Sequence, residues 1–247
     1  DGSFFKNEVL LDVINHCKKN KSDLHLFCLL SDGGIHSHIN HLFAMLDLCK
    51  KEEFSNVYVH AFLDGRDTLP NVALTYLDEL DKKLKELGIG KLRDVSGRYY
   101  SMDRERMWNL TKEYYDLLIH NEGEKISSCK EYINASYEKG IMDEFIVPAR
   151  LMDEGILKEN DGMVMVNFRP DRITQLFTAI TNKEFKEFER VDFKNTKLVT
   201  MMTPEHTVIS TPAFPPMHLT NTLGEYAASK GLKVLRIAEA SKYPHVT

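Results

Sequence analysis

The chain alternates between short apolar runs and longer segments in which apolar residues recur every three or four positions. The runs predict strands at residues 24–30, 57–63, 94–97, 163–168, 198–202 and 233–237. The helical spacing predicts helices over residues 39–46, 72–87, 108–118, 173–180 and 223–231. The period of the apolar positions is what separates the two kinds of element.

The order of these elements predicts the fold class. The first two runs are almost continuously apolar, which is typical of strands covered on both faces. Strands that alternate with helices favour a mostly parallel sheet between two helical layers. We therefore predict an α/β fold, a three-layer α/β/α domain spanning residues 1–247. Residues 122–162 fit the alternation least well, and we interpret them as a helical or irregular elaboration at the sheet edge.

Composition narrows the classes of function. The chain has 247 residues and a net charge of −5, which argues against nucleic-acid binding through a basic surface. No run approaches the roughly 18 apolar residues of a membrane helix, so we expect no membrane association. The four scattered cysteines and the absence of a charged-then-apolar leader favour a cytoplasmic protein. The missing initiator Met leads us to expect a piece of a longer polypeptide.

Charged residues gather in the turns that follow the predicted strands. In an open α/β sheet, ligands bind at the carboxyl ends of the strands. The candidate binding residues at these ends are His36, Arg66, Asp67, Arg98, Arg104, Arg169 and Arg172. A guanidinium group matches carboxylate and phosphate oxygens with two parallel hydrogen bonds, so several arginines at one edge predict a small, multiply anionic ligand. Asp67 adds an acceptor or proton-transfer group, and His36 follows a Gly-Gly turn.

Two other interpretations of the same residues stay open. His36, His38 and His41 are residue types that bind zinc, which allows a metallohydrolase, although their spacing is not diagnostic. A stand-alone binding module for a small phosphorylated acid would need the same arginines and no chemistry. The Asp32-Gly33-Gly34 turn matches no nucleotide-binding pattern. No residue stands in the recognisable context of a nucleophile, so no catalytic residue is assigned with certainty.

Six segments of the chain resemble the cofactor-independent (2,3-bisphosphoglycerate-independent) phosphoglycerate mutases. They are GSFFKNEVL at 2–10, LLSDGGIHSHINHL at 29–42, HAFLDGRDTLP at 60–70, SGRYYSMDRERMW at 96–108, VNFRPDRITQL at 166–176 and SKYPHVT at 241–247. The resemblance spans the whole chain in order.

The resemblance implies a division of labour between two domains. In that family, a phosphatase-like domain carries two manganese ions and a phosphorylatable serine, and an inserted domain binds the phosphoglycerate. The chain matches only the inserted substrate-binding (phosphotransferase) domain, so we expect no metal ligand in it and an inactive fragment. The whole enzyme, an isomerase of glycolysis and gluconeogenesis, would interconvert 3-phosphoglycerate and 2-phosphoglycerate through a phosphoserine, without added 2,3-bisphosphoglycerate. We also expect a monomer.

The resemblance also assigns residues to the substrate. It implies substrate contacts for His36, Arg66, Asp67, Arg98, Arg104, Arg169, Arg172 and Lys242. The pattern of strand ends alone misses Lys242. For Asp67 and His36 the resemblance allows proton-transfer roles.

Overall fold

The computed structural model describes residues 2–217 and 219–239. The chain forms two compact units, residues 1–215 and residues 216–247, which are described separately. Among the described residues, no helix is long and apolar enough to cross a membrane.

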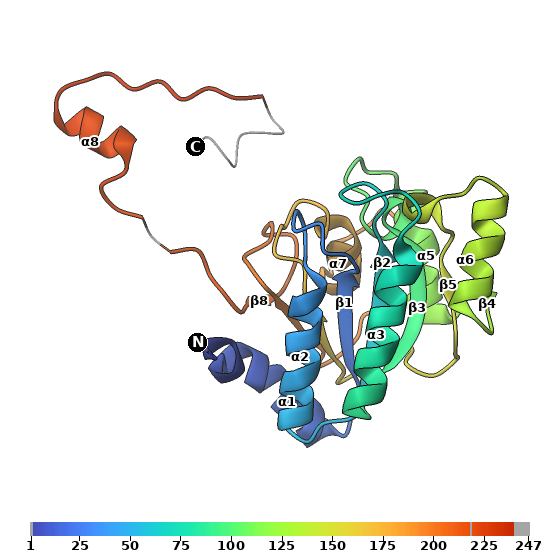
Figure 1. The fold of residues 1–247 in the computed structure, drawn as a ribbon. Coiled ribbons are helices and arrows are strands. Elements are labelled where there is room, and N and C mark those ends of the chain that lie inside the picture. The colour runs from blue at the N-terminus through green and yellow to red at the C-terminus, as the bar shows by residue number, and fades with distance from the viewer. Residues whose placement is uncertain (1, 218, 240–247) are drawn as a thin grey trace. The chain divides into compact units, whose positions relative to one another are not determined.

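The first unit is built on one eight-stranded sheet (Figure 1). Its strands are β1 (Leu24–Leu29), β2 (Val57–Leu63), β3 (Lys91–Gly97), β4 (Glu124–Lys125), β5 (Ala149–Arg150), β6 (Gly162–Met165), β7 (Lys197–Thr200) and β8 (Thr211–Pro212). They lie in the order β4-β5-β3-β2-β1-β6-β7-β8. Every pairing is parallel except that of β3 with β5, so the predicted mostly parallel sheet is confirmed.

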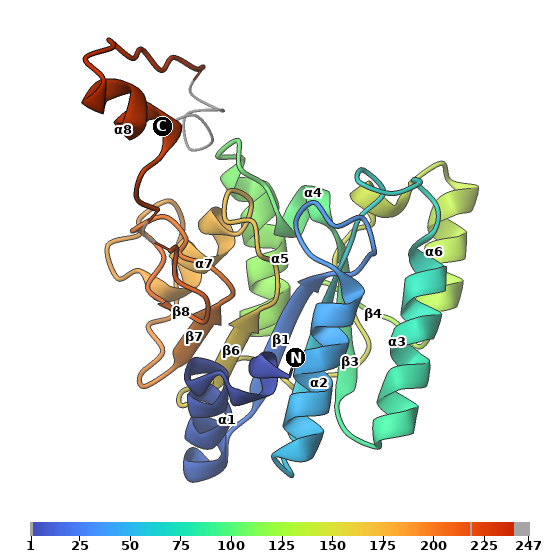
Figure 2. The same cartoon turned by 60° about the vertical axis from the view of Figure 1, so that its left-hand side comes forward.

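Helices cover both faces of this sheet (Figure 2). They are α1 (Glu8–Asn20), α2 (Ile39–Lys51), α3 (Ala73–Leu87), α4 (Arg98–Ser101), α5 (Trp108–His120), α6 (Cys129–Glu138) and α7 (Thr174–Thr181), with 3-10 turns η1 (Ser3–Lys6) and η2 (Asp143–Phe145). One apolar core lies against α1, α2, α3 and α6, and the other against α5 and α7. The predicted three-layer α/β/α architecture is therefore confirmed.

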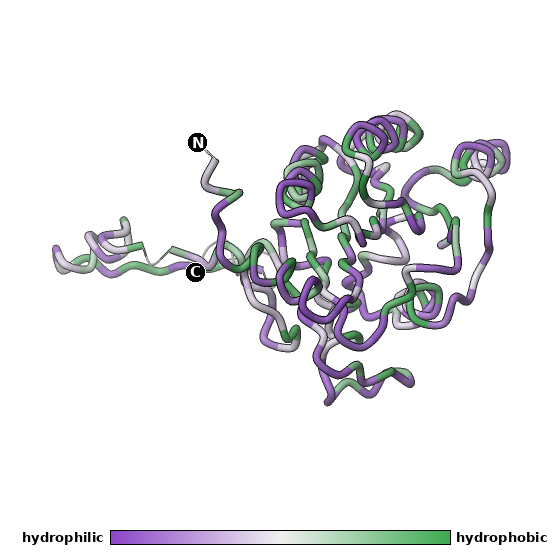
Figure 3. The backbone as a smooth tube through the Cα atoms, turned by 90° about the horizontal axis from the view of Figure 1, so that it is seen from below, coloured by the Kyte–Doolittle hydropathy of each residue, from purple (hydrophilic) through white to green (hydrophobic). Residues whose placement is uncertain are grey.

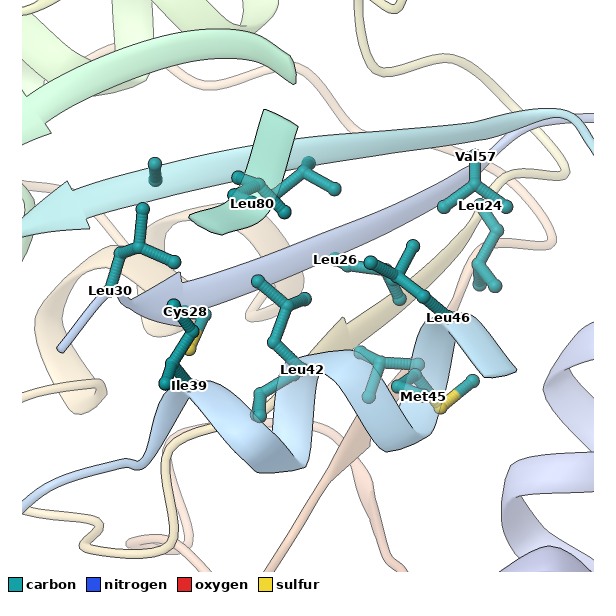
Figure 4. Close-up of a cluster of buried hydrophobic side chains, with 14 of the residues drawn as sticks. Leu24, Leu26, Cys28, Leu30, Ile39, Leu42, Met45, Leu46, Val57 and Leu80 are labelled. Carbon is teal, nitrogen blue, oxygen red and sulfur yellow. The ribbon is translucent and has the colours of Figure 1, made fainter. Parts of the chain in front are cut away.

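The alternating faces of β1 explain its nearly continuous apolar run, which only His25 interrupts. Leu26 and Cys28 lie in the first core, where Leu42 and Leu46 of α2 point toward β1 (Figure 4). Phe27 lies in the second core, on the opposite face. Successive side chains of a strand point to opposite faces, so a strand covered by helices on both sides is apolar at every position. Viewed along the sheet, the inner sides of the helices are the more hydrophobic ones (Figure 3).

Most predicted elements appear in the structure, and one does not. Residues 122–162 contain α6, η2 and the short strands β4 and β5, which confirms the helical or irregular edge elaboration. The predicted strand at 233–237 is wrong, because these residues have exposed side chains and no strand partner among the described residues. An unpaired strand leaves its backbone groups without partners and is not stable alone. The described part of the second unit holds one helix, α8 (Leu223–Ser229), as the pattern predicts.

Parallel pairing brings the strand ends to one edge. Leu29 of β1 pairs with Phe62, and Leu63 of β2 pairs with Gly97. On the other side of β1, Phe27 pairs with Met165 of β6. The chain passes from β1 to β2 on one side and later adds β6 on the other side of β1, and such a switch point is where open α/β sheets form a ligand crevice.

A network of buried polar side chains lies on the second face of the sheet, the face that α5 and α7 cover. The Asp94 carboxylate accepts hydrogen bonds from His60 Nδ1 at 2.7 Å, Arg93 Nη1 at 2.8 Å and the Tyr114 hydroxyl at 2.9 Å. His25 Nδ1 lies 2.9 Å from His60 Nε2. Burial alone would raise the pKa of Asp94, but His60 and Arg93 outweigh it and lower the pKa to about 2. Asp94 is therefore the ionised centre of this network.

Replacing Asp94→Asn should cost the fold about 3–5 kcal/mol, because it leaves the fully buried Arg93 charge without its counterion. Urea unfolding of the purified chain measures this loss. The matched control is Asp81→Asn, which breaks an exposed pair with Lys85 and should cost less than about 0.5 kcal/mol. Equal losses in the two variants would contradict the role given to the buried network.

Candidate functional site

The loop after β1 carries His36 to the carboxyl edge of the sheet. The loop is closed by the Ile39 amide, which donates to the Ser31 carbonyl at 2.8 Å, and by the Ser37 hydroxyl, which donates to the Leu29 carbonyl. It is tied to the loop after β6, since the Phe168 amide donates to the His36 carbonyl at 2.8 Å. The His36 side chain is only 3% exposed, and its Nδ1 has no hydrogen-bond partner.

The loop after β2 is organised by Asp64. Its Oδ1 accepts from the Arg66 amide at 3.3 Å and the Asp67 amide at 3.0 Å, and its Oδ2 accepts from the Ser31 hydroxyl at 2.6 Å. This turn of backbone around an aspartate side chain presents residues 66 and 67 at the sheet edge. Burial alone would raise the pKa of Asp64, but Ser31, the Asp67 amide and Arg98 outweigh it and lower the pKa.

Arg98 stands at the end of β3 as a buried cation. Its Nη1 donates to Asp64 Oδ1 and to Asp67 Oδ2, both at 2.7 Å, and the side chain is 1% exposed. Asp67 also faces His36, with 3.9 Å between Oδ2 and the imidazole Nε2. Arg98 thus joins the loops after β2 and β3 and points Asp67 toward the loop after β1.

The loop that carries Arg104 is pinned to α7. The Asp103 carboxylate accepts from the amides of Glu105 and Met107, and from Gln175 Nε2 at 2.8 Å. Gln175 Oε1 in turn accepts from the Arg106 amide at 2.8 Å. These bonds hold a loop whose residue 106 has a φ of 60°. Arg104 is therefore fixed against the helix that follows β6.

The loop after β6 contributes Arg169, Asp171 and Arg172. Arg169 donates to both oxygens of Asp171, from Nε at 3.0 Å and from Nη2 at 3.1 Å. Arg104 Nη1 donates to Asp171 Oδ2 at 2.7 Å. Arg172 Nη1 donates to the Met102 carbonyl at 3.2 Å.

The electrostatics reflect a concentration of positive charge. Burial, together with Arg98, Arg104 and Arg66, lowers the pKa of Arg172 to about 10, with Asp171 opposing them. Arg172 stays charged at neutral pH, and an arriving anion would relieve the repulsion it experiences. Burial lowers the pKa of His36 to about 4, and Arg98 acts in the same direction. His36 is therefore a neutral imidazole at pH 7.

The structure brings the predicted strand-end residues to one edge, with differences in exposure. His36 and Arg98 are buried, whereas Arg66 is 56% exposed and pairs with Glu144 at 3.1 Å. Arg66 follows β2 and Arg172 follows β6, and the parallel pairing of both strands with β1 brings their ends to the same edge. Lys242 lies outside the described residues. Whether these side chains contact substrate stays a prediction.

The histidine cluster does not assemble as a metal site. His38 Nδ1 accepts from the Asn40 amide at 3.2 Å and caps α2, and the His41 ring packs on Phe168 at 5.6 Å. Across residues 2–217 and 219–239, no three His, Cys, Asp or Glu side chains converge as a set of ligands. The hydroxyls of Ser31 and Ser37 are buried and engaged with Asp64 and a backbone carbonyl. The arrangement of the edge is suited to binding an anion.

Sequence reasoning missed the acidic partners of the arginines. Asp64, Asp171 and Glu144 pair with Arg98, with Arg104 and Arg169, and with Arg66, respectively. The Asp-Gly pair after β2 was a local signal for Asp64, because an aspartate before a glycine favours such a turn. Glu144 gave no signal, since it lies 78 residues from Arg66 in a segment without clear periodicity.

Comparisons with known proteins agree with this geometry. The family described as BPG-independent PGAM N-terminus matches residues 1–205. The chain is 46% identical over 253 residues to the 2,3-bisphosphoglycerate-independent phosphoglycerate mutase of Listeria welshimeri, and 47% identical over 249 residues to that of Staphylococcus saprophyticus. These alignments cover 100% of the chain and 50% and 49% of the relatives, so the chain spans about half their length.

A solved structure extends the likeness to three dimensions. Leishmania mexicana phosphoglycerate mutase, crystallised at low cobalt concentration, superimposes with a TM-score of 0.86 at 27% identity. The match covers 100% of this chain and 48% of the Leishmania chain. With the match over residues 1–205 and the strand-end arginines in place, the chain belongs to the family of the BPG-independent phosphoglycerate mutase N-terminus.

Proposed function

We propose that the chain is the phosphoglycerate-binding (phosphotransferase) part of a cofactor-independent phosphoglycerate mutase. The observation that carries the proposal is the group of arginines that parallel pairing brings to one edge from the ends of β2, β3 and β6. Five guanidinium groups at one edge suit a ligand with both a phosphate and a carboxylate. 3-Phosphoglycerate and 2-phosphoglycerate are such ligands, and the names of the relatives support them.

The rest of the reaction belongs to a part of the protein that this chain does not include. We propose that residues 1–247 are inserted in a metal-dependent phosphatase-like domain, which supplies two manganese ions and the serine that takes the phosphoryl group. The relatives are about twice as long as this chain, which supports this arrangement over a stand-alone binding module. A monomeric state and a cytoplasmic location are further parts of the proposal.

Each side chain has a proposed part in holding the substrate. Arg66, Arg98, Arg104, Arg169 and Arg172 would bind the carboxylate and the phosphate, with Lys242 from the return segment. Asp67, held by Arg98 at 2.7 Å, and the neutral His36 would hydrogen-bond the hydroxyl groups of the glycerate. Holding glycerate at several points would keep it in place while it reorients, which is how positioning contributes to rate.

The two parallel hydrogen bonds that each guanidinium group can form should matter more for activity than the positive charge alone. In the whole protein that carries this chain, Arg66→Lys and Arg172→Ala should each lower kcat/KM by about 10- to 100-fold, the value of a charge-assisted hydrogen bond of about 1.5–3 kcal/mol. Lys82→Ala, on the exposed side of α3, is the control and should change it less than twofold, as expected for a surface substitution of about 0.5 kcal/mol or less. Full turnover in either arginine variant would refute the proposed binding of substrate by these arginines.

The isolated chain should bind 3-phosphoglycerate weakly and should not form 2-phosphoglycerate. Its site is open to solvent at Arg66 and Arg104, where water weakens each ion pair to about 1 kcal/mol at 4 Å. A coupled assay with excess manganese, on a preparation free of host enzyme, measures the product. Sustained turnover would show that this chain contains its own nucleophile.

The neutral state of His36 predicts an acid dependence of stability. Its pKa is about 4 when folded and near 6.5 when unfolded, so the unfolded chain binds the proton more tightly. The contribution of His36 is complete above pH 6.5 and is lost as the pH falls toward 4. His36→Gln should therefore reduce the loss of unfolding free energy between pH 7 and pH 4.5. An unchanged pH profile in this variant would mean that the folded imidazole titrates normally.

A further inference from the structure

The Asp171 carboxylate pairs with two of the five arginines, Arg104 and Arg169. It receives two hydrogen bonds from the Arg169 fork and one from Arg104 Nη1. This is the geometry in which guanidinium groups bind a carboxylate or phosphate ligand. An internal carboxylate thus makes the contacts that an anionic ligand would make.

A second observation shows that a contact is missing beside it. His36 Nδ1 lies 3.6 Å from Asp171 Oδ1, outside hydrogen-bond distance, and has no partner although the side chain is 3% exposed. Buried polar atoms are nearly always paired, so an orphan at the edge of a site points to a missing or displaced partner. A small rotation of Asp171 would supply that partner, and it would release an oxygen from the arginines.

The charge and exposure of the group allow such an exchange. Burial alone would raise the pKa of Asp171, but Arg169, His36 and Arg104 outweigh it and lower the pKa, so the group is a carboxylate. Asp171, Arg169 and Arg104 are each about one-third exposed, so an anion from solvent can reach them. An incoming anion that replaces Asp171 keeps both guanidinium groups paired throughout.

We propose that Asp171 is a positioning residue that stands in for the ligand's anionic group and yields its place on Arg104 or Arg169 to that group. The inference rests on the anion site of the proposed function. In the ligand-free site, Asp171 keeps both guanidinium groups paired and competes with an incoming phosphate or carboxylate for them. After the exchange, the freed oxygen accepts from His36 Nδ1–H. That bond fixes the tautomer that carries its proton on Nδ1.

The first test is the binding of inorganic phosphate to Asp171→Asn, measured by calorimetry on the purified chain at pH 7.5 and constant ionic strength. Without the internal competitor, phosphate should bind about three- to tenfold more tightly, since partly exposed ion pairs are each worth only a few-fold. A merely structural ion pair between loops would leave phosphate affinity unchanged or weaker, and that result would overturn the proposal.

The matched control is Glu105→Gln. Glu105 lies 3.4 Å from Nε of the same Arg104 and is 71% exposed, but it shares neither Arg169 nor His36. Its removal deletes the same charge beside the same arginine and should change phosphate affinity less than about twofold, as exposed pairs contribute little. An equal gain in both variants would mean general electrostatics and would overturn the proposal.

A measurement on the unsubstituted chain decides the matter if Asp171→Asn does not fold. Phosphate should shift the imidazole ¹⁵N resonance of His36 Nδ1 in the direction of a stronger hydrogen bond. No shift at phosphate saturation would overturn the proposal.

Parallel titrations with 3-phosphoglycerate separate this inference from the proposed function. Tighter phosphate binding in Asp171→Asn, together with no preference for 3-phosphoglycerate over phosphate, would refute the proposed function and leave the stand-in role supported. A clear preference for 3-phosphoglycerate without any gain in Asp171→Asn would refute the stand-in role alone.

Discussion

Arg98 is a buried positive charge, and the geometry of the carboxyl edge depends on how that charge is balanced. Removing a guanidinium group from water is costly unless a carboxylate lies against it, and here Asp64 and Asp67 both do, at 2.7 Å. The pairing fixes the direction of Asp67 and the turn around Asp64. The same charge acts outward, because together with burial, the larger cause, it lowers the pKa of His36 and of Arg172. Burial and this one ion therefore help to keep the His36 imidazole neutral and to concentrate positive charge around Arg172.

The fold was predictable because its signal is local and repeated. A strand covered on both faces is apolar at nearly every position, and residues 57–63 show this clearly enough that the predicted range equals β2. The prediction of a strand at 233–237 is wrong for a reason that a local sequence pattern cannot show. Whether an apolar run forms a strand depends on a neighbour to pair with, and no described residue provides one there.

The site was predictable only in part, for the same reason. The arginines follow strands directly, so parallel topology was enough to place them at one edge. Their acidic partners are another matter, because Glu144 reaches Arg66 across 78 residues and Asp171 reaches Arg104 across 67. Such pairings are products of tertiary packing and leave no period or spacing in the sequence. The sequence was enough to place the arginines at this edge, but the carboxylates that balance their charge could be identified only in the structure.

The segment with the weakest sequence pattern has the tightest packing against the site. A Cβ atom at Gly97 would lie 2.3 Å from the Glu144 carbonyl oxygen, and Gly97 directly precedes Arg98. A Cβ atom at Gly65, which has a φ of +66° and directly precedes Arg66, would lie 2.8 Å from the Glu144 amide nitrogen and 2.9 Å from Asp143 Cβ. Asp143 Oδ2 accepts from the amides at 72 and 73, so the same turn also caps α3. Only glycine permits two strand ends to approach one turn this closely. The edge elaboration that contains η2 therefore fixes the positions of Arg66 and Arg98, which follow β2 and β3. A shift of η2 would move both cations together.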